Sequence, residues 1–591
     1  LLMKNIIDRF NKFILALIIA LTFTFSILLF LDYNNMIYFQ TINRVTFKSS
    51  FDVDVDLNLP LIMLILINIL LLLFKRKFII VVFTLLLMIP IYFFLGVSSS
   101  LCLMGFILSL ESIFVFKVFE EFVILISLFW FMLEFSSLIY WAIIEPFKIP
   151  YPLTQIVKLD YDIYSVMALF SCPIFLILAF HWIINPLIGS FLKDLIRILG
   201  LMLNLGEKPF YKEFKLHYKL IFVLAIILAV VTALYPHIPL INPYGYSIAT
   251  DMRHYINEAR RLQSNLWYAF KGYISGSRPL MLLLIYGLSK FSGLSLEIIV
   301  KFMPLIIHPL LTITVYFMVK KATGDGELAS LSSLLTVLGI IPTSNMYAYI
   351  LANTLAIAIL YASIGFLLNS MKNVNLKEAI ISALIGVVAL LVHPWTFLQY
   401  YAAISLMALI VMFKPLIKQR KLYLKPLIPP LIFLLITGIV SIVKSTFFGG
   451  VEMAYLINEV MNWFKLKTPV ISHLINFWRE SIMAFSIYYG GSISNTIIML
   501  LALLGVYTIK DVEMKDFMTS ITMVSIAAYT IVYDHSKVRI LLNIPLGVMA
   551  AYGLIRIIKS RSISKRMKTI VFTTTITSMI TYTMRFLANI C

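Results

Sequence analysis

Apolar runs long enough to cross a lipid bilayer recur along almost the whole chain, and they restrict its fold more than any other feature. A helical span needs roughly 20 apolar residues, and about 17 runs meet that requirement. The sequence therefore predicts an all-α polytopic membrane protein with about 17 transmembrane helices.

The chain has too few polar side chains to cover the surface of a soluble protein of 591 residues. Hydrophobic residues make up 61% of the chain and charged residues only 13%, so no soluble domain of ordinary size remains once the spans are subtracted. The three cysteines lie far apart and form neither a metal-binding nor a disulfide pattern. Composition therefore restricts the chain to the polytopic membrane proteins.

The distribution of positive charge predicts the orientation of the spans. The net charge of +20 is compatible with nucleic-acid binding, but the basic residues gather in short loops between spans. Short basic loops tend to stay in the cytoplasm. If the N-terminus is also cytoplasmic, most of the basic residues lie on that side of the membrane. The loops are residues 75–77, 193–219, 320–321, 414–425 and 556–568. We therefore expect a multi-pass protein of the cell membrane, with residue 251 outside, membrane lipids as partners and no nucleic acid.

A basic amphipathic segment at residues 191–218 is expected to divide the chain into two membrane modules. Its charge suits a cytoplasmic helix that lies against anionic headgroups. A six-span module at residues 1–190 precedes it, and a second module at residues 219–591 follows, with outside loops at 237–297 and 444–491. The spans of the second module are predicted near residues 220–236, 298–319, 328–344, 348–371, 376–395, 398–413, 426–443, 492–508, 517–533, 538–557 and 568–587.

The most polar interval of the second module surrounds Asp251, between its first two spans. Charge in a chain of this composition indicates function, because ionisable groups are costly near lipid. Helical spacing would place Asp251, Tyr255 and Glu258 on one face. Two plainer interpretations stay open: a solvated amphipathic helix that links two spans, and an Asp251 that serves only as a helix N-cap.

The apolar stretch at residues 280–291 follows this interval and is too short to span a bilayer. We predict an interfacial helix there, with Pro279 in its first turn. Basic residues left outside by this topology gather in the loops of the second module, at residues 253–301, 444–479, 537 and 539. A phosphate anion held at the outer surface would explain that concentration. Binding to outer-leaflet headgroups is the alternative.

Several motifs occur in a fixed order along residues 218–590. They are a span, an outside Asp-x-x-x-Tyr at Asp251 and Tyr255, Arg278-Pro279-Leu280, an interfacial helix that ends at Phe291-Ser292-Gly293, and a late element from Arg539 to Pro545. This order resembles the GT-C glycosyltransferases, most closely the branch of the protein O-mannosyltransferases and the lipid A aminoarabinose transferases. The chain departs from that family at Met252, where a second acid is common, and near Asn353, where relatives often have an aspartate. The six N-terminal spans lie outside the resemblance.

The resemblance implies a sugar donor linked through phosphate to a polyprenyl lipid, and a lipid, glycan or protein acceptor on the extracytoplasmic face. A phosphate leaving group needs cations, and the candidates are Arg278, Arg539, Lys537 and Arg253. Asp251 is the candidate base for the acceptor hydroxyl, and a single base opposite the leaving phosphate implies inversion at the sugar. Tyr255, Glu258 and His393 are candidates for substrate binding.

No cofactor is assured by these residues, although a divalent metal stays open because Asp52, Asp54 and Asp56 alternate in an outside loop. Two other functions also stay open. A transporter or flippase of lipid-linked substrates could use Glu111 and Glu134, which lie inside apolar runs. A polymerase or ligase of lipid-linked glycans would depend on a large outer loop such as residues 444–491.

Overall fold

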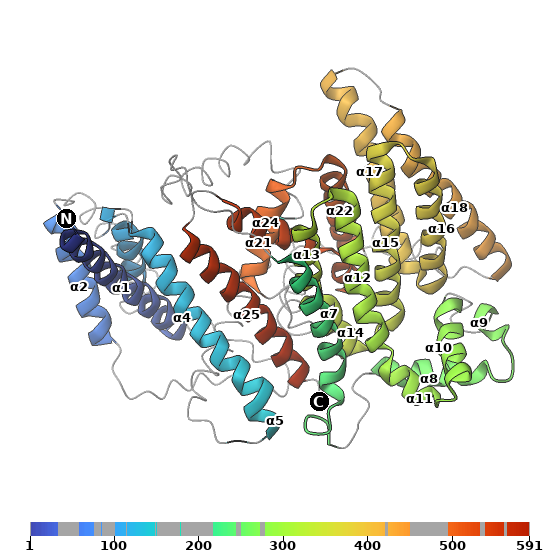
Figure 1. Ribbon diagram of the computed structural model, residues 1–591, viewed down its shortest axis with the longest axis horizontal. Coiled ribbons are helices and arrows are strands. Elements are labelled where there is room, and N and C mark those ends of the chain that lie inside the picture. Colours follow the sequence, from blue (N-terminus) through green and yellow to red (C-terminus); the bar gives the residue numbers. More distant parts are fainter. Residues whose placement is uncertain are drawn as a thin grey trace, which may run out of the picture.

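The computed structural model describes most of the second module and parts of the first (Figure 1). The described residues are 2–33, 58–75, 84, 101–113, 115–116, 118–147, 149, 178, 217–243, 250–271, 278–419, 424–448, 495–531, 538–560 and 564–589. Throughout these ranges the regular secondary structure is helical and no strand occurs. The predicted all-α class is therefore confirmed.

Eight helical segments within the described ranges are long and apolar enough to cross a membrane, which agrees with the predicted membrane protein. They are Glu121–Phe147, Tyr218–His237, Leu296–Thr323, Gly326–Met346, Leu351–Asn373, Pro394–Lys414, Lys425–Phe447 and Ile540–Ile558. Shorter apolar helices accompany them, including Pro279–Ser292 and Ile497–Thr508. The number of about 17 spans stays a prediction, because several of those runs lie outside the described residues.

The helices of the N-terminal part pack against the last helix of the chain. Helices α1 (Leu2–Tyr33), α2 (Asn58–Phe74) and α4 (Phe119–Ile139) lie together at one edge of the molecule, and α25 (Lys565–Asn589) runs beside α4 (Figure 1). Two threonines of α25 donate hydrogen bonds to carbonyl oxygens of α4: Thr574 to Ser127 at 3.3 Å and Thr581 to Glu134 at 3.0 Å. Residues more than 400 positions apart in sequence thus meet at this contact.

Most of the other helices form the main bundle. They are α7 (Tyr218–Leu234), α12 (Pro304–Thr323), α13 (Gly326–Val337), α14 (Ile340–Ala348), α15 (Leu351–Asn373), α16 (Leu376–Val392), α17 (Pro394–Gln419), α18 (Ile428–Phe448), α21 (Thr496–Thr508), α22 (Val512–Ile531), α23 (Val538–Leu542) and α24 (Leu546–Ile558). One continuous core of leucine, isoleucine, methionine and alanine side chains joins them. Helices in its centre, such as α13 and α15, are buried almost all round, as expected for helices with apolar residues on every face.

Two glycines bring α21 and α24 into backbone contact. A Cβ atom at Gly505 would lie 1.8 Å from the carbonyl oxygen of Met549, and one at Gly553 would lie 2.1 Å from that of Leu501. No side chain fits at either position, because the obstacle is backbone. Helices in lipid gain stability from such close approach, since van der Waals contacts replace the missing hydrophobic drive.

The span predicted at residues 328–344 is broken into α13 and α14. Pro342 lacks an amide hydrogen, so the carbonyl oxygen of Leu338 cannot receive the usual helical bond from the residue four positions later. That oxygen instead accepts a hydrogen bond from the Thr583 hydroxyl at 2.9 Å. Gly339 between the two helices has an extended backbone. The sequence analysis predicted neither the break, although Pro342 marks it, nor its compensation by α25.

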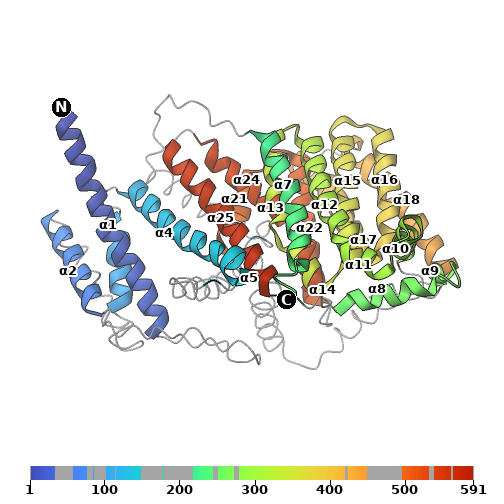
Figure 2. The same ribbon diagram turned by 60° about the horizontal axis from the view of Figure 1, so that its bottom comes forward.

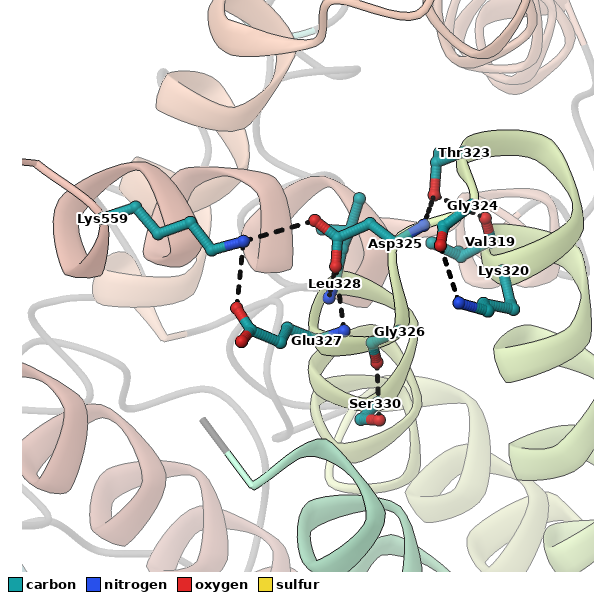
Figure 3. A network of polar contacts seen from close by, with 10 residues as sticks. All are labelled: Val319, Lys320, Thr323, Gly324, Asp325, Gly326, Glu327, Leu328, Ser330 and Lys559. Carbon is teal, nitrogen blue, oxygen red and sulfur yellow. Dashed lines mark hydrogen bonds and ion pairs between the residues drawn. The ribbon is translucent and has the colours of Figure 1, made fainter. Parts of the chain in front are cut away.

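One end of the bundle carries a set of ion pairs between neighbouring helices. Lys559, just after α24, lies 3.4 Å from Asp325 and 2.9 Å from Glu327 at the start of α13 (Figure 3). Lys321 pairs with Glu378 at 2.8 Å, and Lys414 pairs with Asp516 at 3.0 Å. Burial alone would lower the pKa of Lys559, but the hydrogen bond to Glu327 and the two nearby carboxylates raise it overall. These lysines belong to the clusters predicted to face the cytoplasm.

Asp325 has two separable roles at this end. Its carboxylate caps α13 by accepting from the amides of Glu327 at 2.9 Å and Leu328 at 3.1 Å, and it also faces Lys559 (Figure 3). We expect Asp325→Ala to destabilise the protein by about 1–2 kcal/mol, because the cap is lost. Asparagine caps a helix as well as aspartate does. Asp325→Asn should therefore lose only the half-exposed ion pair with Lys559, which contributes less than about 1 kcal/mol of stability. Thermal melts of the two detergent-purified variants measure these losses of stability. If Asp325→Ala and Asp325→Asn lost the same stability, the cap would contribute nothing.

Candidate functional site

Helix α8 (Thr250–Arg261) lies across the end of the bundle opposite the ion pairs (Figures 1 and 2). Met252, Tyr255, Ile256 and Ala259 bury one face of it in a second hydrophobic core. That core also contains residues of α10 (Pro279–Ser292), α11 (Leu296–Phe302), the start of α15 and the end of α16. Apolar residues at helical spacing therefore fix the position of α8, and with it the half-buried Asp251 in its first turn.

Tyr255 attaches α8 to the start of α15. Its side chain is only 1% exposed, and its hydroxyl oxygen accepts a hydrogen bond from the amide of Ala352 at 3.3 Å. The first amides of a helix lack partners within that helix, so a side-chain oxygen is needed there. Tyr255 was predicted to bind substrate; the structure gives it this helix-capping contact.

We expect Tyr255→Phe to destabilise the protein by about 1 kcal/mol, because the ring stays and one buried hydrogen bond is lost. Tyr255→Ala should cost about 3–5 kcal/mol, since it also opens a cavity under α8. The two melting temperatures in detergent check this ranking. If both variants melted like the unaltered protein, α8 would not be held by this contact.

Glu258 is tied into a local cluster at the end of α8. It is 7% exposed, accepts a hydrogen bond from the Tyr268 hydroxyl and lies 3.4 Å from Arg261. Burial, followed by the hydrogen bond to Glu258, raises the pKa of Tyr268, so this phenol stays protonated and remains the donor. Asp251, Tyr255 and Glu258 do lie toward the buried side of α8, as the helical spacing predicted. The contacts of Glu258, however, are those of a residue that links α8 to α9 (Tyr268–Lys271).

His393 occupies the break between α16 and α17. Its backbone is extended, Pro394 opens α17, and its Nδ1 atom accepts a hydrogen bond from the Thr396 amide at 3.2 Å. His393 is thus the N-cap of α17, a role that a side-chain acceptor fulfils at a helix start.

A chain of amide and hydroxyl groups joins this break to α15, α22 and α23. We call it the outer polar network; its members are Asn353, His393, Thr396, Gln399 and Asn543. Thr396 donates to the side-chain oxygen of Asn353, whose Nδ2 donates to Oδ1 of Asn543 at 3.2 Å. Asn543 Nδ2 donates to Gln399 Oε1 at 2.6 Å.

Gln399 extends the network to the helix that carries Arg539. Its Nε2 atom donates to the carbonyl oxygen of Ile540 at 2.9 Å and to the Ser525 hydroxyl at 2.6 Å. Tyr400 donates to the carbonyl oxygen of Asn543 at 2.8 Å. All the network residues are buried. Buried amides must be paired to be tolerated, so each of these bonds restricts how α15, α17, α22 and α23 fit together.

The network brings together segments that the sequence analysis had selected separately. Ala352, bonded to Tyr255, precedes Asn353, so α8 lies next to the network. Arg278 opens α10, whose residues Met281, Leu282 and Ile285 share a core with Tyr255 and with Val392 beside His393. The backbone of Arg539 is described within α23, but its side chain is not, and Lys537 lies outside the described residues. Arg253 is exposed on α8.

Sequence reasoning missed Thr396, Gln399 and Asn543 as partners, and noted Asn353 only for not being an aspartate. Polar amides inside otherwise apolar spans were the signal that could have found them. Glu111, in the N-terminal part, accepts a hydrogen bond from Thr84 at 2.8 Å. Within the described ranges no group of three or more His, Cys, Asp or Glu side chains could hold a metal ion, and Asp52, Asp54 and Asp56 lie outside those ranges.

No protein-family model matches the sequence, and no curated protein matches it.

Proposed function

We propose that the chain is an integral-membrane glycosyltransferase of the GT-C type. It moves a sugar from a polyprenyl-phosphate donor to an acceptor hydroxyl on the extracytoplasmic face, with inversion. The observation that supports this most strongly is the meeting of α8, the α16–α17 break and α23 through the Tyr255–Ala352 and Asn353–Asn543 hydrogen bonds. These segments carry Asp251, His393 and Arg539, three residues selected from separate motifs.

The proposed reaction needs one base and several cations. The Asp251 carboxylate takes the proton of the acceptor hydroxyl as its oxygen attacks the anomeric carbon. The bond from that carbon to the phosphate oxygen breaks, and polyprenyl phosphate leaves with the electron pair. Arg278, Arg539, Lys537 and Arg253 are proposed to stabilise the charge that develops on the phosphate. Asp251 lies in the first turn of α8, where a carboxylate interacts favourably with the positive end of the helix dipole.

The distribution of charge supports the extracytoplasmic placement. Lys321, Lys414 and Lys559 lie at the end of the bundle with the ion pairs, and short basic loops favour the cytoplasm. Helix α8 and the outer polar network lie at the opposite end, where lipid-linked sugars would meet them.

A transfer assay tests the proposal. Membranes that contain the chain, and matched membranes that lack it, are supplied with a panel of radiolabelled polyprenyl-phosphate sugars. We expect chain-dependent loss of label from the donor and release of polyprenyl phosphate for at least one sugar. If no donor is consumed while its uptake or movement across the membrane depends on the chain, the protein is a transporter or flippase instead.

A further inference from the structure

The turn that joins α10 to α11 exposes two large apolar side chains. We call residues 289–295 the α10–α11 turn. Phe291 in this turn is 96% exposed and Leu294 is 46% exposed. Helix α8, at the same end of the bundle, instead exposes polar residues such as Arg253 and Asn257. Exposed apolar side chains that lie close together indicate contact with another protein or with a membrane.

Two serine side chains pair the backbone of the turn from within. Ser289 Oγ donates a hydrogen bond to the carbonyl oxygen of Leu294 at 2.7 Å, and Ser292 Oγ donates to that of Leu288 at 2.6 Å. The amide of Leu294 donates to Ser292 Oγ at 3.3 Å, and the amide of Gly293 donates to the carbonyl oxygen of Ser289 at 3.0 Å. In water the solvent could pair with these groups, whereas near lipid the protein must pair them itself. The turn meets that second requirement.

The level of the turn along the following span agrees with contact to the membrane. Helices α11 and α12 together form one candidate span, Leu296–Thr323. The lysine pair at residues 320–321 marks its inner end, and the roughly 20 residues that cross a hydrocarbon core reach from there to Lys301. Residues before Lys301 therefore lie where the outer headgroups begin, which is the depth at which interfacial helices bury their apolar side.

The exposed apolar side of this span leads to the turn. Ile298, Ile306 and Ile313 are partly exposed and lie seven or eight residues apart, which is the spacing of one helix face. Leu294 precedes Ile298 by about one helical turn. The surface that α12 presents to the bilayer therefore continues along α11 as far as the α10–α11 turn.

We propose that the α10–α11 turn inserts into the outer leaflet of the bilayer. Phe291 and Leu294 enter the upper part of the acyl chains, and the exposed Lys290 beside them reaches the headgroup phosphates. The internally paired backbone and the continuity with α12 favour lipid over a second protein as the partner. The sequence analysis predicted an interfacial helix at residues 280–291; the part that enters the lipid is the turn that follows.

Insertion of the turn would also fix the level of α8. Residues of α8, α10 and α11 belong to one hydrophobic core, so these three helices are held together. A turn anchored in the leaflet therefore keeps α8, with Asp251 in its first turn, at the membrane surface. The inference does not depend on sugar transfer and holds whatever reaction the chain carries out.

Spin labels on single cysteines test the insertion in the full chain reconstituted into phospholipid vesicles. The three native cysteines are replaced by serine, and labels are attached to Phe291→Cys or Leu294→Cys. Power-saturation electron paramagnetic resonance then compares collisions with oxygen, which concentrates in lipid, and with a water-soluble nickel chelate. Asn257→Cys on the exposed side of α8 is the matched control in water, and Ile313→Cys on α12 is the control in lipid.

We expect the ratio of oxygen to nickel collisions at Phe291→Cys to be several-fold higher than at Asn257→Cys and lower than at Ile313→Cys. Leu294→Cys should give the same order, and it decides the question if Phe291→Cys does not fold. A ratio at both turn positions equal to that at Asn257→Cys would mean that the turn lies in water and would overturn the inference. Few collisions with either reagent would mean that protein covers the turn, which would also overturn it.

Discussion

Replacing Asp251 with asparagine is expected to lower the rate of sugar transfer at least about 100-fold while the protein stays folded, because a positioned general base contributes roughly that much or more. Asparagine has nearly the same shape as aspartate, and Asp251 is only half-buried in the first turn of α8. The loss of its favourable interaction with the helix N-terminus should cost less than about 1 kcal/mol of stability. The expected pattern is therefore a fall in kcat with little change in melting temperature.

Glu297→Gln is the matched control for this experiment. Glu297 is a carboxylate at the same end of the bundle, where it pairs with Arg260 across α8 and α11. Both side chains are about half exposed, so the pair contributes little. Transfer by Glu297→Gln should stay within about twofold of the unaltered protein. Full activity of Asp251→Asn in the same membranes would remove Asp251 from the mechanism.

Replacing Gly553 with leucine should prevent folding. A Cβ atom there would collide with the carbonyl oxygen of Leu501, and neither helix can move away, since α24 also packs against Thr336 of α13 through Gly547. Overpacking usually costs about 1–3 kcal/mol, and a collision with the α21 backbone should exceed that range. We expect no monodisperse peak in size-exclusion chromatography of the detergent extract.

Gly287→Ala provides the control for that substitution. Gly287 lies within α10, and nothing would lie within 4 Å of a Cβ atom added there. Alanine should be tolerated or should stabilise α10 by up to about 1 kcal/mol, because a helical glycine loses more conformational entropy on folding. A normal chromatographic peak from Gly553→Leu would mean that α21 and α24 do not approach as closely as described.

Much of the helical framework of the second module could be predicted from the sequence, because apolar length and proline position are local signals. Pro279 opens α10 and Gly293 closes it in the left-handed conformation, as the motif Pro279 to Gly293 suggested. The break at His393-Pro394 lies within a few residues of the boundary predicted between the spans at 376–395 and 398–413. Each of these helix ends is determined by residues within about one turn of it.

The pairing of polar groups could not be predicted, because it depends on residues far apart in the chain. The Asn353–Asn543 bond spans 190 positions, and the Thr583–Leu338 bond spans 245. Glu258 was selected because its spacing from Asp251 was helical. Its contacts with Tyr268 and Arg261 depend on the turn after α8, which the sequence did not predict. The outside loop was predicted to begin at residue 444, because a charged residue normally ends an apolar run, but α18 continues to Phe448.

The central claim is that α8 and the outer polar network face the outside of the cell, away from the ion-pair end. Cysteine accessibility tests it most directly, in a chain whose three native cysteines are replaced by serine. Asn257→Cys reports on an exposed position of α8, and Lys377→Cys on an exposed position at the start of α16, beside the Lys321–Glu378 pair. A membrane-impermeant maleimide added to intact cells should label the chain with Asn257→Cys, and should label the chain with Lys377→Cys only after the membrane is permeabilised. The reverse pattern would contradict the account.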